Sequence, residues 1–433
     1  MNSTRLHRDT SVADWKTVHE PPGTWTPEAF DRLLVEAFDQ HASDVILAPE
    51  TPIWARVHGR FIAISSRPLS DGEIQILTNH AARSDTAANE VLAGKDKDCA
   101  TEVYVRRGET RRFRVNATAC QNGTATSISL VLRTIPGRPP DLAEMDIEPA
   151  LMDTLIPQNG LVIVTGTTGS GKSTLLAAVL AYIRQNYPWH MITYEHPIEF
   201  DLRDIPNAMG PCVQSEVPYH IKEFGRAARN ANRRAPDVAL VGESRDPETF
   251  RGVMELADSG PRVYTTGHTR SVEETPARIV AVFPPGEQSF RTGLLMAALR
   301  LIVHQRLLPR KGGGRVAIRS FLAIDQYVRD QVVGLSAAQS VAILRTLVAT
   351  RGQTLLVSAQ KALEKGLIEE TEVEKIRQEM ESSQDIVVGP LESAPASDFQ
   401  ESAVIGPGCR KSRRRNTGAP FCGRVESGAA EDR

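Results

Sequence analysis

A glycine-rich stretch between an apolar run and a helix-forming run carries the clearest chemical signal in the chain. Backbone N–H groups in such a loop, together with the positive end of the following helix, form a cradle for phosphate oxygens. The pattern places a lysine on the β- and γ-phosphates and a serine hydroxyl on Mg²⁺. It therefore predicts a nucleoside triphosphate site in which Lys172 binds phosphate and Ser173 binds the metal. The stretch comprises Gly166, Thr167, Thr168, Gly169, Ser170, Gly171, Lys172, Ser173 and Thr174.

Hydrolysis also requires residues that place Mg²⁺, orient a water and neutralise charge on the transferring phosphate. An acidic stretch at residues 193–200 contains Glu195, expected to hold the attacking water, and Glu199 four residues later. The apolar run at 237–243 ends in Glu243, the Walker B arrangement in which a carboxylate holds the metal shell or polarises the nucleophile. Solvation of a turn or of a strand end is the structural alternative for these acids.

Two further groups of side chains are candidates for contact with phosphate. His268, in the run 264–269, is expected to sense the γ-phosphate, although a histidine can also cap a strand for structural reasons. Guanidinium groups bind phosphate oxygens with a fork of N–H donors, within one chain or as an arginine finger from a neighbour. The sequence leaves open which arginines face a neighbour; the candidates are Arg114, Arg133, Arg229, Arg233 and Arg245.

Length and composition bound the possible classes of protein. The 433 residues suggest two or three domains, and the contents of 41% hydrophobic and 24% charged residues are ordinary for a soluble globular protein. A net charge of −2 gives no global attraction to nucleic acid or to an acidic membrane. The five cysteines are too scattered for a disulfide framework, and no apolar run is long enough to cross a bilayer. We therefore expect a soluble, cytoplasmic protein.

The order of patterns along the chain predicts its domains. Residues 1–25 are a polar leader, and residues 26–135 alternate helical and strand-like runs in the manner of a small α+β domain. A proline-rich linker at 136–141 precedes a parallel α/β domain at 142–330, whose strands end at the candidate catalytic residues. A helical appendage at 331–381 and a disordered, Ser/Pro/Gly-rich tail at 382–433 complete the chain. The tail holds a basic cluster at 410–415 and two cysteines, Cys409 and Cys422.

Together these motifs resemble the secretion ATPase superfamily, the motors of type IV pili and of type II and type IV secretion. The segments 195–200, 242–246 and 267–269 are similar to the acidic box, the Walker B block and the histidine box of its pilus-retraction branch. Landmarks of the first domain follow in the same order at 42–44, 56–59, 112–116 and 133–136. The segments 193–195, 213–218 and 242–249 look most like the ATPases of type IVB secretion and of conjugal plasmid transfer. Two positions depart from the retraction pattern, His196 in place of aspartate and Gly267 in place of leucine.

The resemblance implies a fold, an activity and partners. The fold is α/β, a RecA-like P-loop ATPase domain preceded by a small α+β, PAS-like domain. The activity is ATP hydrolysis with Mg²⁺ by a homohexamer, and the linker at 136–141 is the hinge about which the two domains rotate. The ring docks on an inner-membrane secretion or conjugation complex, so membrane association is peripheral, and no sequence-specific nucleic-acid binding is expected.

Three alternative functions remain open at this stage. A pilus-retraction motor belongs to the same class, whereas a nucleotide-dependent switch that does not hydrolyse ATP belongs to another. The joint presence of Glu195, Glu243 and His268 argues against the switch. A RecA-like nucleic-acid motor is disfavoured because the ordered part shows no basic groove interleaved with aromatic residues.

Overall fold

The fold was analysed on a computed structural model, which describes residues 21–57, 59–106, 109–135 and 137–385. Most of the predicted leader, the basic cluster at 410–415, Cys409 and Cys422 lie outside the described residues. The predicted domain boundaries stay a prediction. No helix in the described part of the chain is both long enough and apolar enough to cross a membrane.

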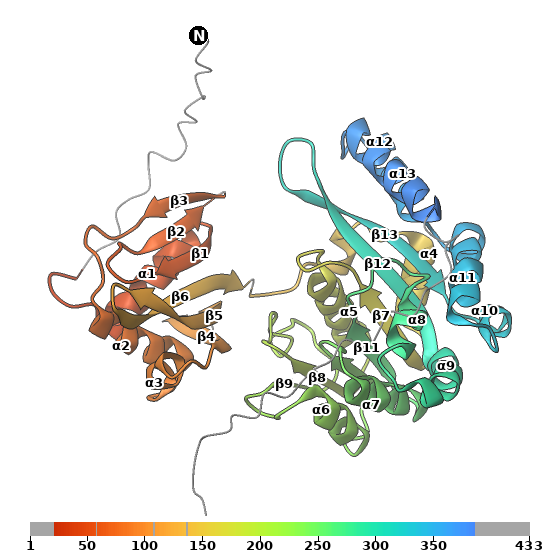
Figure 1. Ribbon diagram of the computed structural model, residues 1–433, viewed down its shortest axis with the longest axis horizontal. Helices are drawn as coiled ribbons and strands as arrows, with labels where there is room; N and C mark the ends of the chain where they lie inside the picture. Colours follow the sequence, from red (N-terminus) through yellow and green to blue (C-terminus); the bar gives the residue numbers. More distant parts are fainter. Residues whose placement is uncertain (1–20, 58, 107–108, 136, 386–433) are drawn as a thin grey trace, which may run out of the picture. The chain divides into compact units, whose positions relative to one another are not determined.

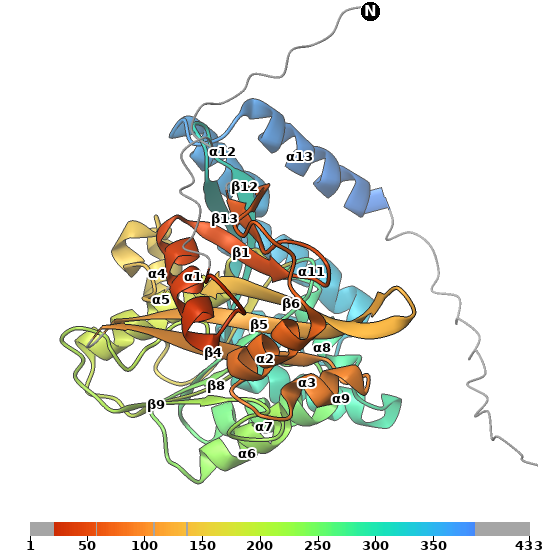
Figure 2. The ribbon, with the colours of Figure 1, turned by 90° about the vertical axis from the view of Figure 1, so that its left-hand side faces the viewer.

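The described residues up to 135 build an antiparallel sheet with three helices. The strand order is β3-β2-β1-β6-β5-β4, and α1, α2 and α3 lie across one face of the sheet (Figure 2). Trp25, Phe30 and Leu33 bury their side chains against strand residues such as Val45 and Phe113. The elements are α1 (Pro27–Asp39), β1 (Ala42–Leu47), β2 (Trp54–Val57), β3 (Arg60–Ala63), α2 (Asp71–Ala82), α3 (Ala87–Leu92), β4 (Lys97–Arg106), β5 (Glu109–Asn122) and β6 (Ala125–Ile135).

The second sheet is mainly parallel and has seven strands in the order β13-β12-β7-β11-β10-β8-β9 (Figure 1). Only β13 runs antiparallel to its neighbour, β12. These elements confirm the predicted α/β class with a parallel sheet. They are η2 (Leu142–Glu144), α4 (Pro149–Leu155), β7 (Gly160–Thr165), α5 (Lys172–Asn186), β8 (Met191–Glu195), β9 (Cys212–Glu216), α6 (Phe224–Asn232), β10 (Val238–Val241), α7 (Pro247–Asp258), β11 (Arg262–Thr266), α8 (Thr275–Val280), α9 (Pro285–Ala298), β12 (Leu299–Pro309) and β13 (Arg315–Ala323).

Helices cover both faces of the parallel sheet, which is why β7 and β10 are buried at every position. Along β7, Leu161 and Ile163 face a core shared with α6, α7 and α9. Val162 and Val164 face the opposite core, which contains α4 and α5. Burial on both faces fixes the register of β7, and therefore the point at which the glycine-rich loop begins.

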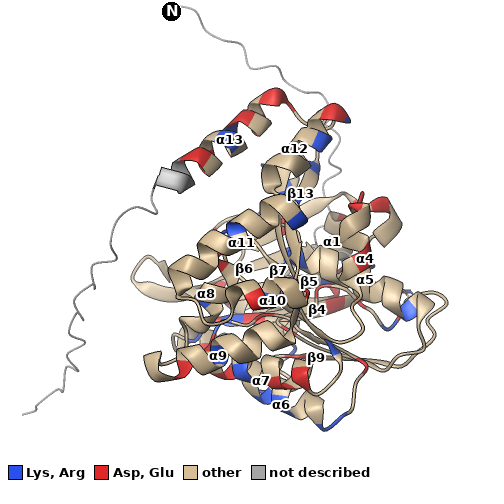
Figure 3. Cartoon of the chain, turned by 90° about the vertical axis from the view of Figure 1, so that its right-hand side faces the viewer, with Lys and Arg blue, Asp and Glu red and all other residues tan. Residues whose placement is uncertain are grey.

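The C-terminal helices pack along the β12–β13 hairpin. Leu308 and Ile318 from the hairpin form a small core with Ala359, Ile368 and Ile376. The last helix has a charged surface rich in acidic residues (Figure 3). The helices are α10 (Gln326–Val332), α11 (Ala337–Arg351), α12 (Leu355–Glu364) and α13 (Glu370–Asp385).

One buried carboxylate ties the start of the first sheet domain together. Glu73 accepts hydrogen bonds from the backbone N–H groups of Trp25 and Ser70 at 2.8 and 2.9 Å, and from Arg67 Nη2 at 2.7 Å. Burial alone would raise the pKa of Glu73, but the hydrogen bonds from Arg67, Ser70 and Trp25 outweigh it and lower this pKa to about 2. The ionised carboxylate therefore stabilises the fold.

We predict that Glu73→Gln lowers the free energy of unfolding by about 1–3 kcal/mol at neutral pH. Because the pKa is lowered in the folded protein, the stabilisation is present above the ordinary value of 4.5 and is lost as the pH falls towards about 2. Urea denaturation across this pH range measures the difference. Glu90→Gln removes an exposed carboxylate and should change stability far less. A Glu73→Gln effect that stays constant down to acid pH would contradict the assignment.

Candidate functional site

The glycine-rich loop leaves the end of β7 and enters α5. Gly166, Gly169 and Gly171 have φ values of 140°, 79° and 83°, which side-chain-bearing residues rarely adopt. A Cβ atom at Gly166 would lie 2.4 Å from the carbonyl oxygen of Gln305, and one at Gly171 would lie 2.9 Å from Gln305 Nε2. The loop therefore needs glycine at both positions to lie against β12.

Lys172 is buried at the start of α5, with only 8% of its surface exposed. Its ammonium group donates to the carbonyl oxygens of Gly166 and Thr167, both at 2.9 Å. No carboxylate within the described residues forms an ion pair with it. Burial lowers the pKa of Lys172, and the charge of Glu199 partly opposes this effect. An ammonium group with three donors and two carbonyl partners retains an N–H for an anion, so the loop fits a nucleotide phosphate.

A cavity of about 370 Å³ opens beside this loop. The carboxyl ends of β8, β10 and β11 meet at its wall, as expected for a ligand site in a parallel sheet. It brings together candidates from five separate parts of the sequence. The predicted site residues that line it are Thr168, Gly169, Lys172, Ser173, Glu195, Glu199, Glu243, Arg245 and His268, with Arg114.

Glu195 is the most strongly desolvated carboxyl group of this cavity. Burial raises its pKa to about 7, although hydrogen bonds from Thr193 and Gln214 act in the opposite direction. Thr193 Oγ1 donates to Glu195 Oε1 at 2.5 Å, and Gln214 Nε2 donates to the same oxygen at 3.1 Å. A carboxyl group that titrates near neutral pH is suited to accept a proton from water.

Glu243, Arg245 and His268 form a second polar group on the cavity wall. Arg245 Nη2 lies 2.9 Å from Glu243 Oε2 and 3.3 Å from His268 Nε2. Because arginine only donates hydrogen bonds, its contact with Nε2 requires an imidazole that is unprotonated there. Burial, followed by the charges of Lys172 and Arg245, lowers the pKa of His268, which also favours the neutral ring.

The wall also offers oxygen atoms suited to a magnesium ion. Ser173 is exposed at the first turn of α5, and both its side chain and Glu243 line the cavity. Mg²⁺ prefers one or two protein oxygen ligands, with water and phosphate completing the shell. Ser173 and Glu243 therefore fit a nucleotide-bound Mg²⁺.

Two of the predicted arginines line the cavity. Arg245 does so beside Glu243, as described above. Arg114, on β5, also lines it and forms a bidentate pair with Asp98, at 3.0 Å from Nε and 2.6 Å from Nη2. Asp98 holds this guanidinium in place but also competes for its donors.

The other three arginines are not among the lining residues. Arg133 Nε donates to Asp44 at 2.9 Å, and Arg229 lies 3.5 Å from Glu248 on the surface. Arg233 ends α6, also outside the cavity. A role for any of them at a neighbouring subunit stays a prediction.

Sequence reasoning missed two polar residues that support the site. Gln214, on β9, orients Glu195, and Gln305, on β12, donates to the carbonyl oxygen of Ser170 in the glycine-rich loop. The available signal was a polar residue at the end of an apolar run, as in 301–305. That signal is weak because it does not identify the partner.

Comparisons with known proteins identify the family of this chain. A model of the family described as "Type II/IV secretion system protein" matches residues 25–384. The chain belongs to this family. The type IV pilus retraction ATPase PilT of Pseudomonas aeruginosa is 33% identical over 338 residues, which cover 78% of this chain and 94% of PilT.

Solved structures of the family share the fold. The ATPase DotB of Legionella pneumophila has a TM-score of 0.77 and 37% identity, covering 83% of this chain and 98% of DotB. The pilus retraction motor PilT with bound ADP has a TM-score of 0.69 and 30% identity, covering 79% of this chain and 95% of PilT. The protein is thus a P-loop secretion ATPase that binds ATP.

We predict that kcat/KM for ATP rises with pH through about 7, because the Glu195 carboxyl must lose its proton before it can accept one. Burial lowers the pKa of His268, the opposite direction to the shift of Glu195. Thr193→Val removes a hydrogen bond that stabilises the Glu195 carboxylate and should move the step to higher pH. Steady-state turnover from about pH 6 to 8.5 measures both effects. A profile without a step in the wild type, or a step that persists in Glu195→Gln, would overturn the assignment.

Proposed function

We propose that this chain is a hexameric ATPase that powers a type IVB secretion or conjugal DNA-transfer apparatus at the cytoplasmic face of the inner membrane. The proposal that the chain hydrolyses ATP rests on one observation. Lys172, Glu195, Glu243 and His268 line the same cavity. Binding alone needs only the loop, whereas the additional acids and the histidine are those required for turnover.

The residues divide the work of hydrolysis. Lys172 binds the β- and γ-phosphates, and Ser173 and Glu243 hold Mg²⁺, which neutralises phosphate charge. Glu195 takes a proton from the attacking water, since its carboxyl group titrates near neutral pH. Glu199 adds negative charge beside Lys172. Neutral His268 is placed to donate or accept a hydrogen bond at the γ-phosphate, and the remaining loop residues supply backbone N–H groups.

Two observations favour the secretion and conjugation machines. The segments 213–218 and 242–249 resemble the ATPases of type IVB secretion and of conjugal transfer. The solved structure of DotB also has a higher identity and TM-score than that of PilT bound to ADP. The partners are therefore further copies of this chain and the proteins of an inner-membrane complex.

A type IV pilus-retraction motor is the second candidate, because PilT of Pseudomonas aeruginosa covers 78% of the chain at 33% identity. Deletion of the gene in its host separates the two candidates. Loss of DNA or protein transfer with normal surface motility supports the first function. Loss of surface motility with normal transfer supports the second.

We predict that Glu243→Gln retains ATP binding but loses at least about a hundredfold in kcat, since the substitution removes a charge needed in the transition state. The change keeps the size of the side chain, so affinity should stay within a few fold. Equilibrium binding of a fluorescent ATP analogue and steady-state turnover are the measurements. Glu255→Gln, at an exposed position of α7, is the matched control and should leave both unchanged. Normal turnover in Glu243→Gln would sink the assigned role.

We also predict that ATP turnover per chain climbs steeply as the protein concentration rises at fixed salt and Mg²⁺. A ring whose sites use arginines from neighbouring chains is active only when assembled. Native mass spectrometry at the same concentrations reports the number of subunits. A concentration-independent rate from a species with the mass of one chain would contradict the ring.

A further inference from the structure

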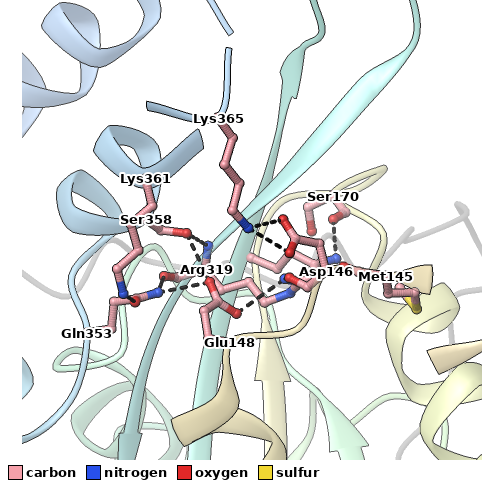
Figure 4. Close-up of polar contacts among 10 residues, drawn as sticks. Met145, Asp146, Glu148, Ser170, Arg319, Gln353, Ser358, Lys361 and Lys365 are labelled. Carbon is pink, nitrogen blue, oxygen red and sulfur yellow. Dashed lines mark hydrogen bonds and ion pairs between the residues drawn. The ribbon is translucent and has the colours of Figure 1, made fainter. Parts of the chain in front are cut away.

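A cluster of buried polar side chains lies behind the glycine-rich loop, outside the cavity lining (Figure 4). We call Glu148, Gln305, Arg319, Gln353 and Ser358 the Arg319 cluster. Arg319 and Gln305 are each only 1% exposed, and Gln353 and Ser358 are also buried. These residues come from four segments of the sequence, which suggests a role that joins the segments.

The cluster begins at the glycine-rich loop. Gln305 Nε2 donates to the carbonyl oxygen of Ser170 at 2.8 Å, and Gln305 Oε1 accepts from Arg319 Nε at 2.9 Å. The nitrogen and the oxygen of the Gln305 amide are thus each held by a different partner. The loop glycines Gly166 and Gly171 lie directly against the same residue. The position of Gln305 therefore limits the conformations open to the loop.

Arg319 connects this amide to the segment before α4. Its Nη1 donates to the carbonyl oxygen of Asp146 at 3.2 Å and lies 3.3 Å from Glu148 Oε2, and its Nη2 donates to the carbonyl oxygen of Met145 at 3.2 Å. Burial lowers the pKa of Arg319, while Glu148 opposes this effect and favours the charged form. The planar guanidinium holds Gln305, which contacts the glycine-rich loop, and the 145–148 segment in one fixed geometry.

Residues of α12 and of the short segment before it supply the remaining hydrogen bonds of the Arg319 cluster. Ser358 Oγ and Gln353 Nε2 donate to Glu148 Oε1 at 3.0 and 2.9 Å, and the backbone N–H of Arg319 donates to Ser358 Oγ at 3.0 Å. Lys361 Nζ donates to Gln353 Oε1 at 2.7 Å. The residue that accepts from α12 is thus the carboxylate that pairs with Arg319.

An apolar contact would be the simpler way to dock a helix on a hairpin, and α12 already has one through Ala359 and Ala362. A buried charge pair is a costly addition unless all of its partners are in place. If α12 moves away, Glu148 loses the hydroxyl donor of Ser358, and the backbone N–H of Arg319 loses its acceptor. The hydrogen bond to Gln305, and through it the glycine-rich loop, then loosens.

We propose that Arg319 is a positioning residue that couples the docking of α12 to the order of the phosphate-binding loop. With α12 docked, the loop is held close to its nucleotide-bound form and binds nucleotide more tightly, because less ordering remains to be done. The coupling is reciprocal, so bound nucleotide also holds α12 in place. The proposal rests on nucleotide binding at the loop and not on which machine the ATPase drives.

Ser358→Ala removes only one hydroxyl group from the cluster and tests the coupling from the side of α12. We expect ADP to bind about fivefold or more weakly, and KM for ATP to rise with little change in kcat. Arg351→Gln breaks the ion pair of α11 with Asp325 and touches none of the cluster, so it is the matched control and should bind ADP normally. Lower thermal stability in Ser358→Ala with unchanged ADP affinity would overturn the proposal.

Hydrogen exchange of the wild-type protein tests the reciprocal effect without any substitution. Saturating ADP should slow exchange of the backbone amides of α12 as well as those of the loop. In Arg319→Lys, which keeps the charge but loses the fork, the loop should still be protected and α12 should not. Unchanged exchange in α12 of the wild type on addition of ADP would refute the coupling. Neither ADP affinity nor hydrogen exchange depends on turnover, so a failure in these two measurements is distinct from a failure of the proposed hydrolysis.

Discussion

The burial of one ammonium group is the constraint on which the site depends. Lys172 has backbone carbonyl groups as its partners and no carboxylate among the described residues. A buried cation without a counter-ion is costly, and a phosphate is the ligand that relieves the cost. The apolar strand β7 and the first turn of α5 hold the lysine in this position, because packing on both faces of the sheet fixes where the loop begins. Nucleotide binding therefore follows from the packing of the parallel sheet.

Around this cation the two main carboxyl groups lie in different surroundings. Burial raises the pKa of Glu195, whose hydrogen-bond donors Thr193 and Gln214 are both neutral. Glu243 instead forms an ion pair with the guanidinium of Arg245 at 2.9 Å. These different surroundings suit Glu195 to proton transfer and Glu243 to charge balance. Burial lowers the pKa of His268, and the nearby cations Lys172 and Arg245 lower it further because they disfavour a protonated ring.

The sequence was sufficient for those features that have a local pattern. The glycine loop, the apolar strands and the acids at strand ends could be predicted, because each depends on neighbouring residues or on the geometry of parallel strands. Gln305 and Arg319 could not, since their partners lie 135 and 171 residues away and nothing in their spacing indicates the pairing. The sequence pattern also does not show that α2 and α3 are separate helices. Arg83 ends the first of them in a left-handed conformation, which sequence pattern alone does not reveal at a non-glycine position.

The Arg319 cluster shows why these missed residues matter for a motor. A rigid P-loop domain without further contacts would bind and hydrolyse ATP, but hydrolysis would then move no other element of the protein. A motor needs elements whose packing has discrete alternatives that nucleotide can bias. In this chain Arg319 joins three elements. Its guanidinium binds Gln305, which contacts the loop, and the segment that leads into α4, and its backbone N–H binds Ser358 of α12. Because none of the three can shift without leaving a buried polar group unpaired, the cluster favours concerted movement over independent loosening.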